Sequence, residues 1–270
     1  MKLFSSVNDV TDLKKFIEEA LILKADPFAN KSLGKDKTIG LVFLNPSLRT
    51  RLSTQKAALN LGMNVMVMNL DKEGWALETE DGVVMNGTTV EHIREAAAVM
   101  GEYCDILGFR SFPKLQDREE DYSERLFNKF VKFCGVPVVS LESATLHPLQ
   151  SFADLITVEE HKKTAKPKVV LTWAPHVKAE GMIDFVITHP EGFELAEKFT
   201  PGATIITDQD EALIGADFVY VKNWSSYQDY GKTLAGAESW MMTNQKLEGT
   251  NDAKVMHCLP VRRNYELSAE

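Results

Sequence analysis

Short apolar runs that alternate with amphipathic stretches constrain the fold of this chain most strongly. Runs rich in β-branched and aromatic side chains predict buried strands, at residues 38–44, 63–68, 104–108, 136–141, 168–173, 183–188, 203–207, 217–221 and 255–257. Helical spacing marks other stretches, at residues 8–24, 47–59, 90–100, 123–133 and 149–160. A strand followed by a crossover helix is typical of parallel sheets covered on both faces. We therefore predict an α/β fold with two domains, each a central parallel sheet flanked by helices.

The expected domains are residues 1–147 and 148–270, with the boundary near His147 and the last residues returning to the first domain. A length of 270 residues fits two domains, although length alone would also fit one α/β barrel. Polar residues collect at the carboxyl ends of the predicted strands: Ser47, Arg49, Arg110, Glu142, His176, Lys222 and Cys258. Open α/β sheets bind ligands at such ends, so we expect an active site in a cleft between the domains.

Composition excludes several classes of protein. Hydrophobic residues make up 44% of the chain and charged residues 26%, as in soluble globular proteins. No apolar run approaches the roughly 20 residues that span a bilayer, and the amphipathic N-terminal stretch does not resemble a signal peptide. Three cysteines far apart in sequence suggest reduced thiols in a cytoplasm and no metal site. The net charge of −9 argues against nucleic acid, so anionic ligands would need local basic clusters.

The segment Ser47–Arg51 has features that predict an anion site. It follows a predicted strand, and Ser47 is expected to be the N-cap of the next helix. The first turn of a helix has free N–H groups and a dipole that favours negative charge. The hydroxyls of Ser47 and Thr50 and the planar fork of Arg49 suit phosphate oxygens. A capped surface helix with exposed arginines is the alternative interpretation.

Three further features could carry chemistry. His147, in the segment His147–Gln150, could donate from a neutral imidazole to a carbonyl, or simply precede a helix that begins with proline. Arg110, at a strand end, could meet the same ligand or lie at the surface. The segment His257–Arg263 contains one cysteine beside one histidine, a poor set of zinc ligands, and a catalytic thiol would need a base. Trp75 lies in a polar loop, where a partner subunit, a ligand or simple packing could cover its indole.

Several common motifs are absent from the sequence. The chain has no Gly-x-Gly-x-x-Gly after a strand, no Walker-type phosphate loop and no Gly-x-Ser-x-Gly elbow. Dinucleotide binding, nucleotide hydrolysis and the α/β-hydrolase reaction therefore have no support.

The segments Ser47–Arg51, Arg110, His147–Gln150 and His257–Pro260 in this order resemble the transcarbamylase family. The resemblance implies that residues 1–147 bind carbamoyl phosphate and residues 148–270 bind an amino-acid substrate. The implied carbamoyl-phosphate ligands are Ser47, Leu48, Arg49, Thr50, Trp75, Arg110, His147 and Gln150. The family forms trimers, so the expected partner is a second copy of the chain, with Trp75 lent to the neighbouring site.

The second half resembles the acylornithine branch of that family. Ornithine enzymes carry Asp-x-x-x-Ser-Met-Gly, which is absent here, whereas Lys222 stands where the branch has a lysine for the α-carboxylate of an N-acylated substrate. Val90 precedes Glu91-His92-Ile93, where acetylornithine enzymes have a glutamate that would repel a succinyl carboxylate. The resemblance therefore favours N-succinylornithine over N-acetylornithine. The implied residues of the amino-acid site are Val90, Glu142, His176, Lys222, Cys258, Leu259 and Arg262.

The implied reaction is carbamoyl transfer from carbamoyl phosphate to the δ-amine of N-succinyl-L-ornithine, a step of arginine biosynthesis that needs no metal or organic cofactor. Arg110, His147 and Thr50 would polarise the carbonyl, and Cys258 with the carbonyl of Leu259 would orient the amine. A non-catalytic carbamoyl-phosphate-binding protein on the same scaffold is the alternative from another class. The stretch after Lys178 is shorter than the family pattern, and the family's C-terminal helix is missing, through omitted residues or through deletion.

Overall fold

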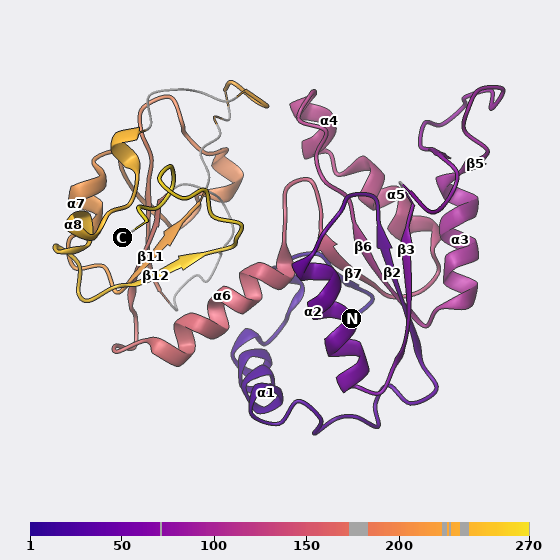
Figure 1. Ribbon diagram of the computed structural model, residues 1–270, viewed down its shortest axis with the longest axis horizontal. Coiled ribbons are helices and arrows are strands. Elements are labelled where there is room, and N and C mark those ends of the chain that lie inside the picture. Colours follow the sequence, from indigo (N-terminus) through magenta and orange to yellow (C-terminus); the bar gives the residue numbers. More distant parts are fainter. Residues whose placement is uncertain (71, 173–182, 223–225, 227, 233–237, 270) are drawn as a thin grey trace. The chain divides into compact units, whose positions relative to one another are not determined.

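The computed structural model describes residues 1–270 except 71, 173–182, 223–225, 227, 233–237 and 270. The chain divides into two compact units, Met1–Phe152 (unit 1) and Ala153–Glu270 (unit 2), each drawn in Figure 1. Each unit contains a five-stranded parallel sheet with helices against it. The predicted fold class of two domains, each built on a central parallel sheet, is confirmed; the location of the site in a cleft between them stays a prediction.

The sheet of unit 1 has the strand order β1-β7-β6-β2-β3, and its neighbours pair in parallel. Its strands are β1 (Leu3–Phe4), β2 (Thr38–Phe43), β3 (Asn64–Asn69), β6 (Ile106–Arg110) and β7 (Val138–Glu142). The helices are η1 (Val7–Asp9), α1 (Leu13–Ala25), α2 (Arg49–Asn60), α3 (Ile93–Tyr103), α4 (Arg118–Tyr122) and α5 (Arg125–Phe133). Two short strands, β4 (Leu77–Glu78) and β5 (Glu91–His92), pair with each other outside this sheet. Helix α6 (Pro148–His161) begins in unit 1 and continues into unit 2.

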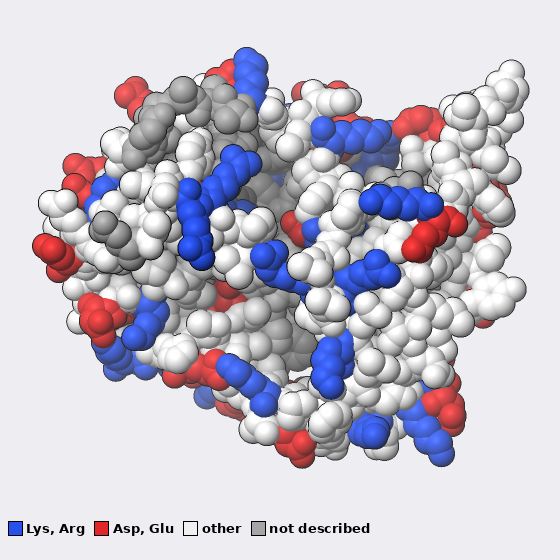
Figure 2. All heavy atoms as spheres, viewed as in Figure 1, with Lys and Arg blue, Asp and Glu red and all other residues white. Residues whose placement is uncertain are grey.

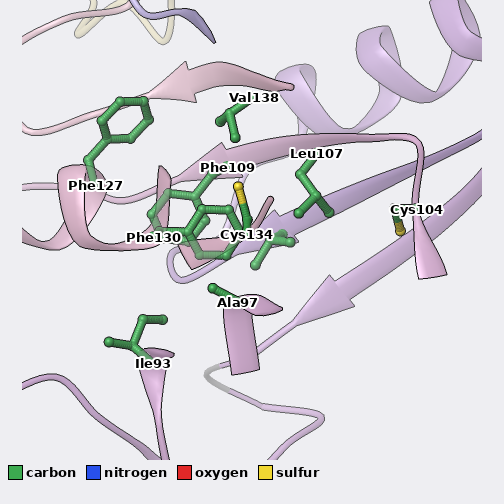
Figure 3. Packing of buried hydrophobic residues seen from close by; sticks show 10 residues of the cluster. Ile93, Ala97, Cys104, Leu107, Phe109, Phe127, Phe130, Cys134 and Val138 are labelled. Carbon is green, nitrogen blue, oxygen red and sulfur yellow. The ribbon is translucent and has the colours of Figure 1, made fainter. Parts of the chain in front are cut away.

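Alternation along the central strands gives unit 1 two apolar cores. Val42 of β2 and Phe109 of β6 point to the face covered by α3 and α5, where the rings of Phe109 and Phe130 stack with centroids 3.9 Å apart (Figure 3). Leu41 and Phe43 point to the opposite face, which also buries Ala58 of α2. The sheet is therefore buried on both sides, as continuous apolar strands predict.

Unit 2 also contains a five-stranded parallel sheet, with the strand order β10-β9-β8-β11-β12. The strands are β8 (Lys168–Thr172), β9 (Asp184–Thr188), β10 (Thr204–Ile206), β11 (Phe218–Val221) and β12 (Lys254–His257). The helices are η2 (Glu197–Phe199), α7 (Gln209–Leu213), η3 (Glu238–Trp240) and α8 (Asn244–Leu247). One face buries Val170, Val186 and Val219 together with Leu213 of α7, and the other buries Leu171, Ile187 and Tyr220.

The predicted strands and long helices are present, with ends that shift by a few residues. The N-terminal helix begins at Leu13, where Asp12 caps it, and the helix predicted at 90–100 begins at Ile93 after the short strand β5. Short elements such as β1, α4 and α7 were missed, because two to five residues show no clear period.

The helices of the described residues are all too short or too polar to cross a membrane. Acidic groups lie among the basic ones on the face seen in Figure 2.

Candidate functional site

The carboxyl ends of four strands in unit 1 stand level with one another. Phe43 of β2 pairs with Asn69 of β3 on one side and with Arg110 of β6 on the other. Arg110 in turn pairs with Glu142 of β7, after a register shift between Phe109 and Arg110. Parallel strands thus bring residues far apart in sequence to one edge, where ligands of such sheets bind.

Helix α2 presents its N-terminus at this edge. Ser47 was predicted as the N-cap, but Leu48 occupies that position, with helical backbone angles and no side-chain cap hydrogen bond. The prediction was wrong by one residue, because Pro46 and Ser47 still belong to the irregular segment that follows β2. Arg49 is exposed and Ser47 and Thr50 are half-buried. Without a side-chain cap, the first N–H groups of α2 can donate to an anion.

Arg110 is the buried cation of the site, with only 5% of its surface exposed. Its Nη1 donates to Oε2 of Glu142 at 2.5 Å and to Oγ1 of Thr50 at 3.3 Å, which ties β6 to the first turn of α2. The guanidinium also lies 4.1 Å from the centroid of the Phe112 ring. Burial lowers the pKa of Arg110 while the Glu142 carboxylate opposes this shift, and an arginine stays protonated at neutral pH.

His147 lies near the same carboxylate oxygen. Its Nε2 is 3.6 Å from Oε2 of Glu142. Its Nδ1 accepts the backbone N–H of Gln150 at 3.4 Å, so a neutral imidazole carries its proton on Nε2. The structure therefore brings Thr50, Arg110 and His147 together with Glu142, a residue that the resemblance assigns to the amino-acid site.

Two residues that the sequence analysis did not identify form hydrogen bonds to the loops that follow β6 and β7. The carboxylate of Glu124, just before α5, accepts from the hydroxyls of Ser143 (2.8 Å) and Thr145 (2.6 Å) and from the backbone N–H groups of Ala144 and Thr145. Oδ1 of Asn45 accepts the backbone N–H of Phe112 at 2.6 Å. Neither residue belongs to a recognisable motif, since both act on segments distant in sequence.

Trp75 and Val90 lie in residues 70–92, the long connection between β3 and α3, which is called the excursion from here on. Both are largely exposed, at 57% and 67%. The indole Nε1 of Trp75 donates to Oε2 of Glu91 at 2.9 Å, and the N–H of Val90 donates to the carbonyl of Ala76. The two side chains therefore belong to one corner of the excursion, with apolar surface directed to solvent.

In unit 2 the segment after β12 is held by a buried carboxylate. Glu266, 1% exposed, accepts at Oε2 from His257 Nε2 (2.9 Å) and from the N–H of Arg262 (3.0 Å). The N–H of Leu259 donates to Nδ1 of His257 at 2.7 Å. These bonds fix the loop that contains Cys258. The sequence motif led to His257, Cys258 and Arg262 but not to Glu266, which closes the loop.

The remaining predicted residues of the amino-acid site also follow strand ends. Val221 of β11 pairs with Thr172 of β8 and with His257 of β12, so Lys222 and Cys258 follow level positions on neighbouring strands. The Cys258 thiol lies near Tyr220; burial chiefly raises the pKa of this tyrosine, and Asp154 and Cys258 act in the same direction. His176 and the segment Lys178–Met182, which the resemblance predicts to be shorter than the family pattern, lie outside the described residues.

Comparison with known families identifies the family of this chain. Residues 2–160 match the carbamoyl-phosphate-binding domain of aspartate/ornithine carbamoyltransferases, and residues 157–270 match the aspartate/ornithine-binding domain. The chain belongs to the aspartate/ornithine carbamoyltransferase family. The family predicted from the segments after the strands is therefore confirmed.

Curated members of this carbamoyltransferase family include close relatives. The N-succinylornithine carbamoyltransferase of Bacteroides thetaiotaomicron is 53% identical, over 98% of this chain and 88% of its own length. The N-acetylornithine carbamoyltransferase of Xanthomonas campestris pv. campestris is 34% identical, over 91% of this chain and 84% of its own length.

Solved carbamoyltransferase structures resemble the whole chain. An N-acetyl-L-ornithine transcarbamylase with acetylcitrulline has a TM-score of 0.88 and 30% identity, and covers 100% of this chain and 91% of its own. A variant of N-acetyl-L-ornithine transcarbamylase with one glutamate replaced by valine, complexed with carbamyl phosphate and N-succinyl-L-norvaline, has a TM-score of 0.87 and 28% identity over the same shares.

Proposed function

We propose that this chain transfers the carbamoyl group from carbamoyl phosphate to the δ-amine of N-succinyl-L-ornithine, giving N-succinyl-L-citrulline and phosphate in arginine biosynthesis. The observation that carries the proposal is the group of Thr50, Arg110 and His147 beside the uncapped start of α2. A cation, an N–H donor and free helix amides suit the two ends of carbamoyl phosphate. The name of the 53% identical relative supports the choice of amine.

Unit 1 would bind and activate carbamoyl phosphate. Ser47, the N–H groups from Leu48 onward and the Arg49 fork would hold the phosphate, and Gln150 would hold the carbamoyl amide. Arg110, Thr50 and the Nε2–H of His147 would donate to the carbonyl oxygen, which gains negative charge as the amine attacks. The C–N bond forms, the C–O bond to phosphate breaks, and the departing phosphate accepts the proton released by the amine.

Unit 2 would bind the acylated amino acid. Lys222, at the end of β11, would meet its α-carboxylate, and His176 and Arg262 would help to bind carboxylate groups. The carbonyl of Leu259 and the thiol of Cys258 would orient the attacking amine, and Glu142, which belongs to unit 1, would accept the amide N–H. Binding two substrates in a fixed orientation can supply much of the rate, so the thiol needs no nucleophilic role.

Val90 supports succinylornithine as the amine. A glutamate at this corner would place a negative charge against the extra carboxylate of a succinyl group, whereas valine carries no charge and leaves more room. The structure of an N-acetyl-L-ornithine transcarbamylase in which valine replaces a glutamate, crystallised with N-succinyl-L-norvaline, agrees with this reasoning. Because Trp75 and Val90 are both exposed on their own subunit, we propose a homotrimer in which Trp75 is lent to the neighbouring site. Three free thiols agree with a cytoplasmic location.

The decisive experiment measures product formation from carbamoyl phosphate with succinylornithine, acetylornithine and ornithine side by side. Strong turnover of succinylornithine alone supports the proposal. Turnover of acetylornithine instead keeps the chemistry and refutes the choice of amine. Carbamoyl-phosphate binding without turnover of any amine identifies a non-catalytic binding protein.

Arg49→Ala tests the phosphate assignment. Because Arg49 is exposed on the first turn of α2, its removal should leave the fold intact and abolish carbamoyl-phosphate binding measured by calorimetry. Lys56→Ala, on an exposed position of the same helix, is the matched control and should bind as wild type does. Undiminished binding by Arg49→Ala would refute the assignment.

Val90→Glu tests the choice of acyl group. The added carboxylate should lower kcat/KM for succinylornithine relative to acetylornithine by about tenfold or more, the effect of an unfavourable charge close to a bound carboxylate. Val84→Glu adds the same charge at a position that is 76% exposed in the same excursion and should leave the ratio unchanged. An equal ratio in both variants would remove the basis for preferring succinylornithine.

A further inference from the structure

The junction between α4 and α5 touches three different segments of unit 1. Asp121, near the end of α4, accepts the backbone N–H groups of Lys114 (3.0 Å) and Leu115 (2.9 Å). These residues follow β6 and the Phe112 ring that lies over Arg110. Asp121 is buried, so its carboxylate replaces water as the partner of those amides.

Glu124 reaches the segment that leads to His147. It accepts four hydrogen bonds from residues 143–145, at 2.6 to 3.2 Å. The same segment closes a turn in which Ser143 N–H donates to the carbonyl of Leu146, and His147 follows directly. A carboxylate with four donors therefore restrains the segment that immediately precedes His147.

Arg125, the next residue, reaches the excursion that carries Trp75 and Val90. Its guanidinium forms two parallel bonds to the Glu80 carboxylate, at 2.5 and 2.8 Å, and a third to Glu120. Both carboxylates raise the pKa of Arg125, and its hydrogen bonds lower the pKa of Glu80. A two-bond fork fixes orientation as well as distance.

Further ionic contacts reinforce this attachment. Lys129, one helical turn later on α5, donates to the carbonyl of Thr79 at 2.5 Å and pairs with Asp81 at 3.1 Å. Arg94 of α3 pairs with Asp81 at 2.7 Å. The excursion is therefore attached to two helices through residues 79–81, ten residues before Val90.

Backbone geometry explains how adjacent residues serve different segments. Glu124 adopts a left-handed conformation with φ of 51°, which an L-residue rarely adopts. This turn separates α4 from α5 (Figure 1) and directs Glu124 and Arg125 to different segments. A cavity of about 50 Å³ lies here, with Ser111, Phe112, Ala144 and Thr79 among its lining residues.

We propose that the α4–α5 junction is a positioning site, in which Glu124 sets the His147 segment and Arg125 independently sets the Trp75–Val90 excursion. Its kinetic consequence rests on the proposed function: Glu124 would govern use of carbamoyl phosphate, and Arg125 would govern choice of the acylornithine. Neither side chain needs to touch a substrate. Two adjacent residues would thus tune catalysis and specificity separately.

Hydrogen exchange measured by mass spectrometry tests the positioning without any substrate. Glu124→Gln replaces one of the two acceptor oxygens with an NH2 donor and removes the negative charge. It should speed exchange in residues 143–147 by about tenfold or more and leave residues 79–92 unchanged. Arg125→Gln should do the reverse, and Arg125→Lys, which keeps the charge without the fork, should recover only part of the protection. Equal loosening of both segments by either variant, or of neither, would overturn the proposal.

Kinetics supply the second measurement. Glu124→Gln should lower kcat by about tenfold or more with the succinyl-to-acetyl preference unchanged. Arg125→Gln should raise KM for the acylornithine and reduce that preference. A wild-type enzyme that uses neither acylornithine would refute the proposed function, while the exchange experiment would still decide the positioning. Separate exchange effects with identical kinetic losses would refute the division of roles.

Discussion

Replacing Glu142 by alanine should destabilise the protein and make that loss sensitive to phosphate. The Glu142 carboxylate is the acidic partner of Arg110, at 2.5 Å, and only 6% of the arginine side chain is exposed. Removing it leaves a buried guanidinium without its counter-charge. Phosphate is the anion that the proposed reaction releases. Held at the start of α2, where Thr50 accepts from Arg110, it would restore part of that charge.

The magnitude follows from the burial of the pair. Breaking a fully buried ion pair costs about 3–5 kcal/mol, but 28% of the Glu142 side chain is exposed, so water compensates in part. We expect a loss of about 2–3 kcal/mol, which in a chain of this size lowers Tm by roughly 4–12 °C. Ligand binding stabilises the state that binds it, so inorganic phosphate should raise the Tm of the variant more than that of wild type.

Thermal unfolding of wild type and Glu142→Ala over a series of phosphate concentrations measures both effects. Glu159→Ala is the matched control, because Glu159 pairs with Lys162 at 2.6 Å in a partly exposed position of α6 and should matter little. A Glu142→Ala variant as stable as wild type without phosphate would refute the buried-pair reasoning. Equal phosphate stabilisation of both proteins would show that the bound anion does not compensate for the charge lost with Glu142.

Other perturbations give distinct outcomes. Glu266→Gln should raise KM for the acylornithine by about tenfold, because a buried charged acceptor of the Arg262 N–H is lost; an unchanged KM would contradict this. Phe130→Ala should cost about 3–5 kcal/mol in the free energy of unfolding by denaturant, because the ring is fully buried against Phe109; a cost below about 1 kcal/mol would contradict the stacking as described. The pKa of Glu80 is lowered chiefly by its hydrogen bonds to Arg125. A lowered pKa keeps the carboxylate charged as the pH falls through the ordinary glutamate range, so protection of the excursion should persist there and be lost only at still lower pH, where Glu80 gains a proton. Hydrogen exchange corrected for its intrinsic pH dependence would check this, and a loss already at pH 7 would contradict it.

Much of the scaffold could be predicted from local patterns. Buried strands such as β2 and β11 are continuous apolar runs, and helices such as α5 repeat apolar residues on one side. Backbone hydrogen bonding and burial act over a few residues, so such periods are visible in a single sequence. The segment after β2 and the residue at the end of β6 could be found for the same reason, since a polar residue that ends an apolar strand stands out.

The partners of those residues could not be predicted in this way. Glu124 serves residues about twenty positions later, and Glu266 closes a loop by reaching back to a strand end. Both are ordinary surface-type residues in sequence, and only the turn between α4 and α5 and the fold of the chain end bring them to their donors. The exposure of a side chain could not be predicted either. The sequence left Trp75 open to several explanations, whereas in the structure its indole donates to Glu91 and the ring lies largely in solvent.

The pairing of Arg110 with Glu142 shows most clearly which features the sequence determines and which the tertiary structure decides. The sequence by itself determined that each residue ends a buried strand. A shift of register between β6 and β7 decided the rest, because Phe109 stands opposite Ser140 while Arg110 stands opposite Glu142, with Leu141 passed over. Side chains alternate between the two faces of a sheet, so that single shift sets which side chain the arginine meets. Register depends on packing across the whole sheet, and only the tertiary structure contains it.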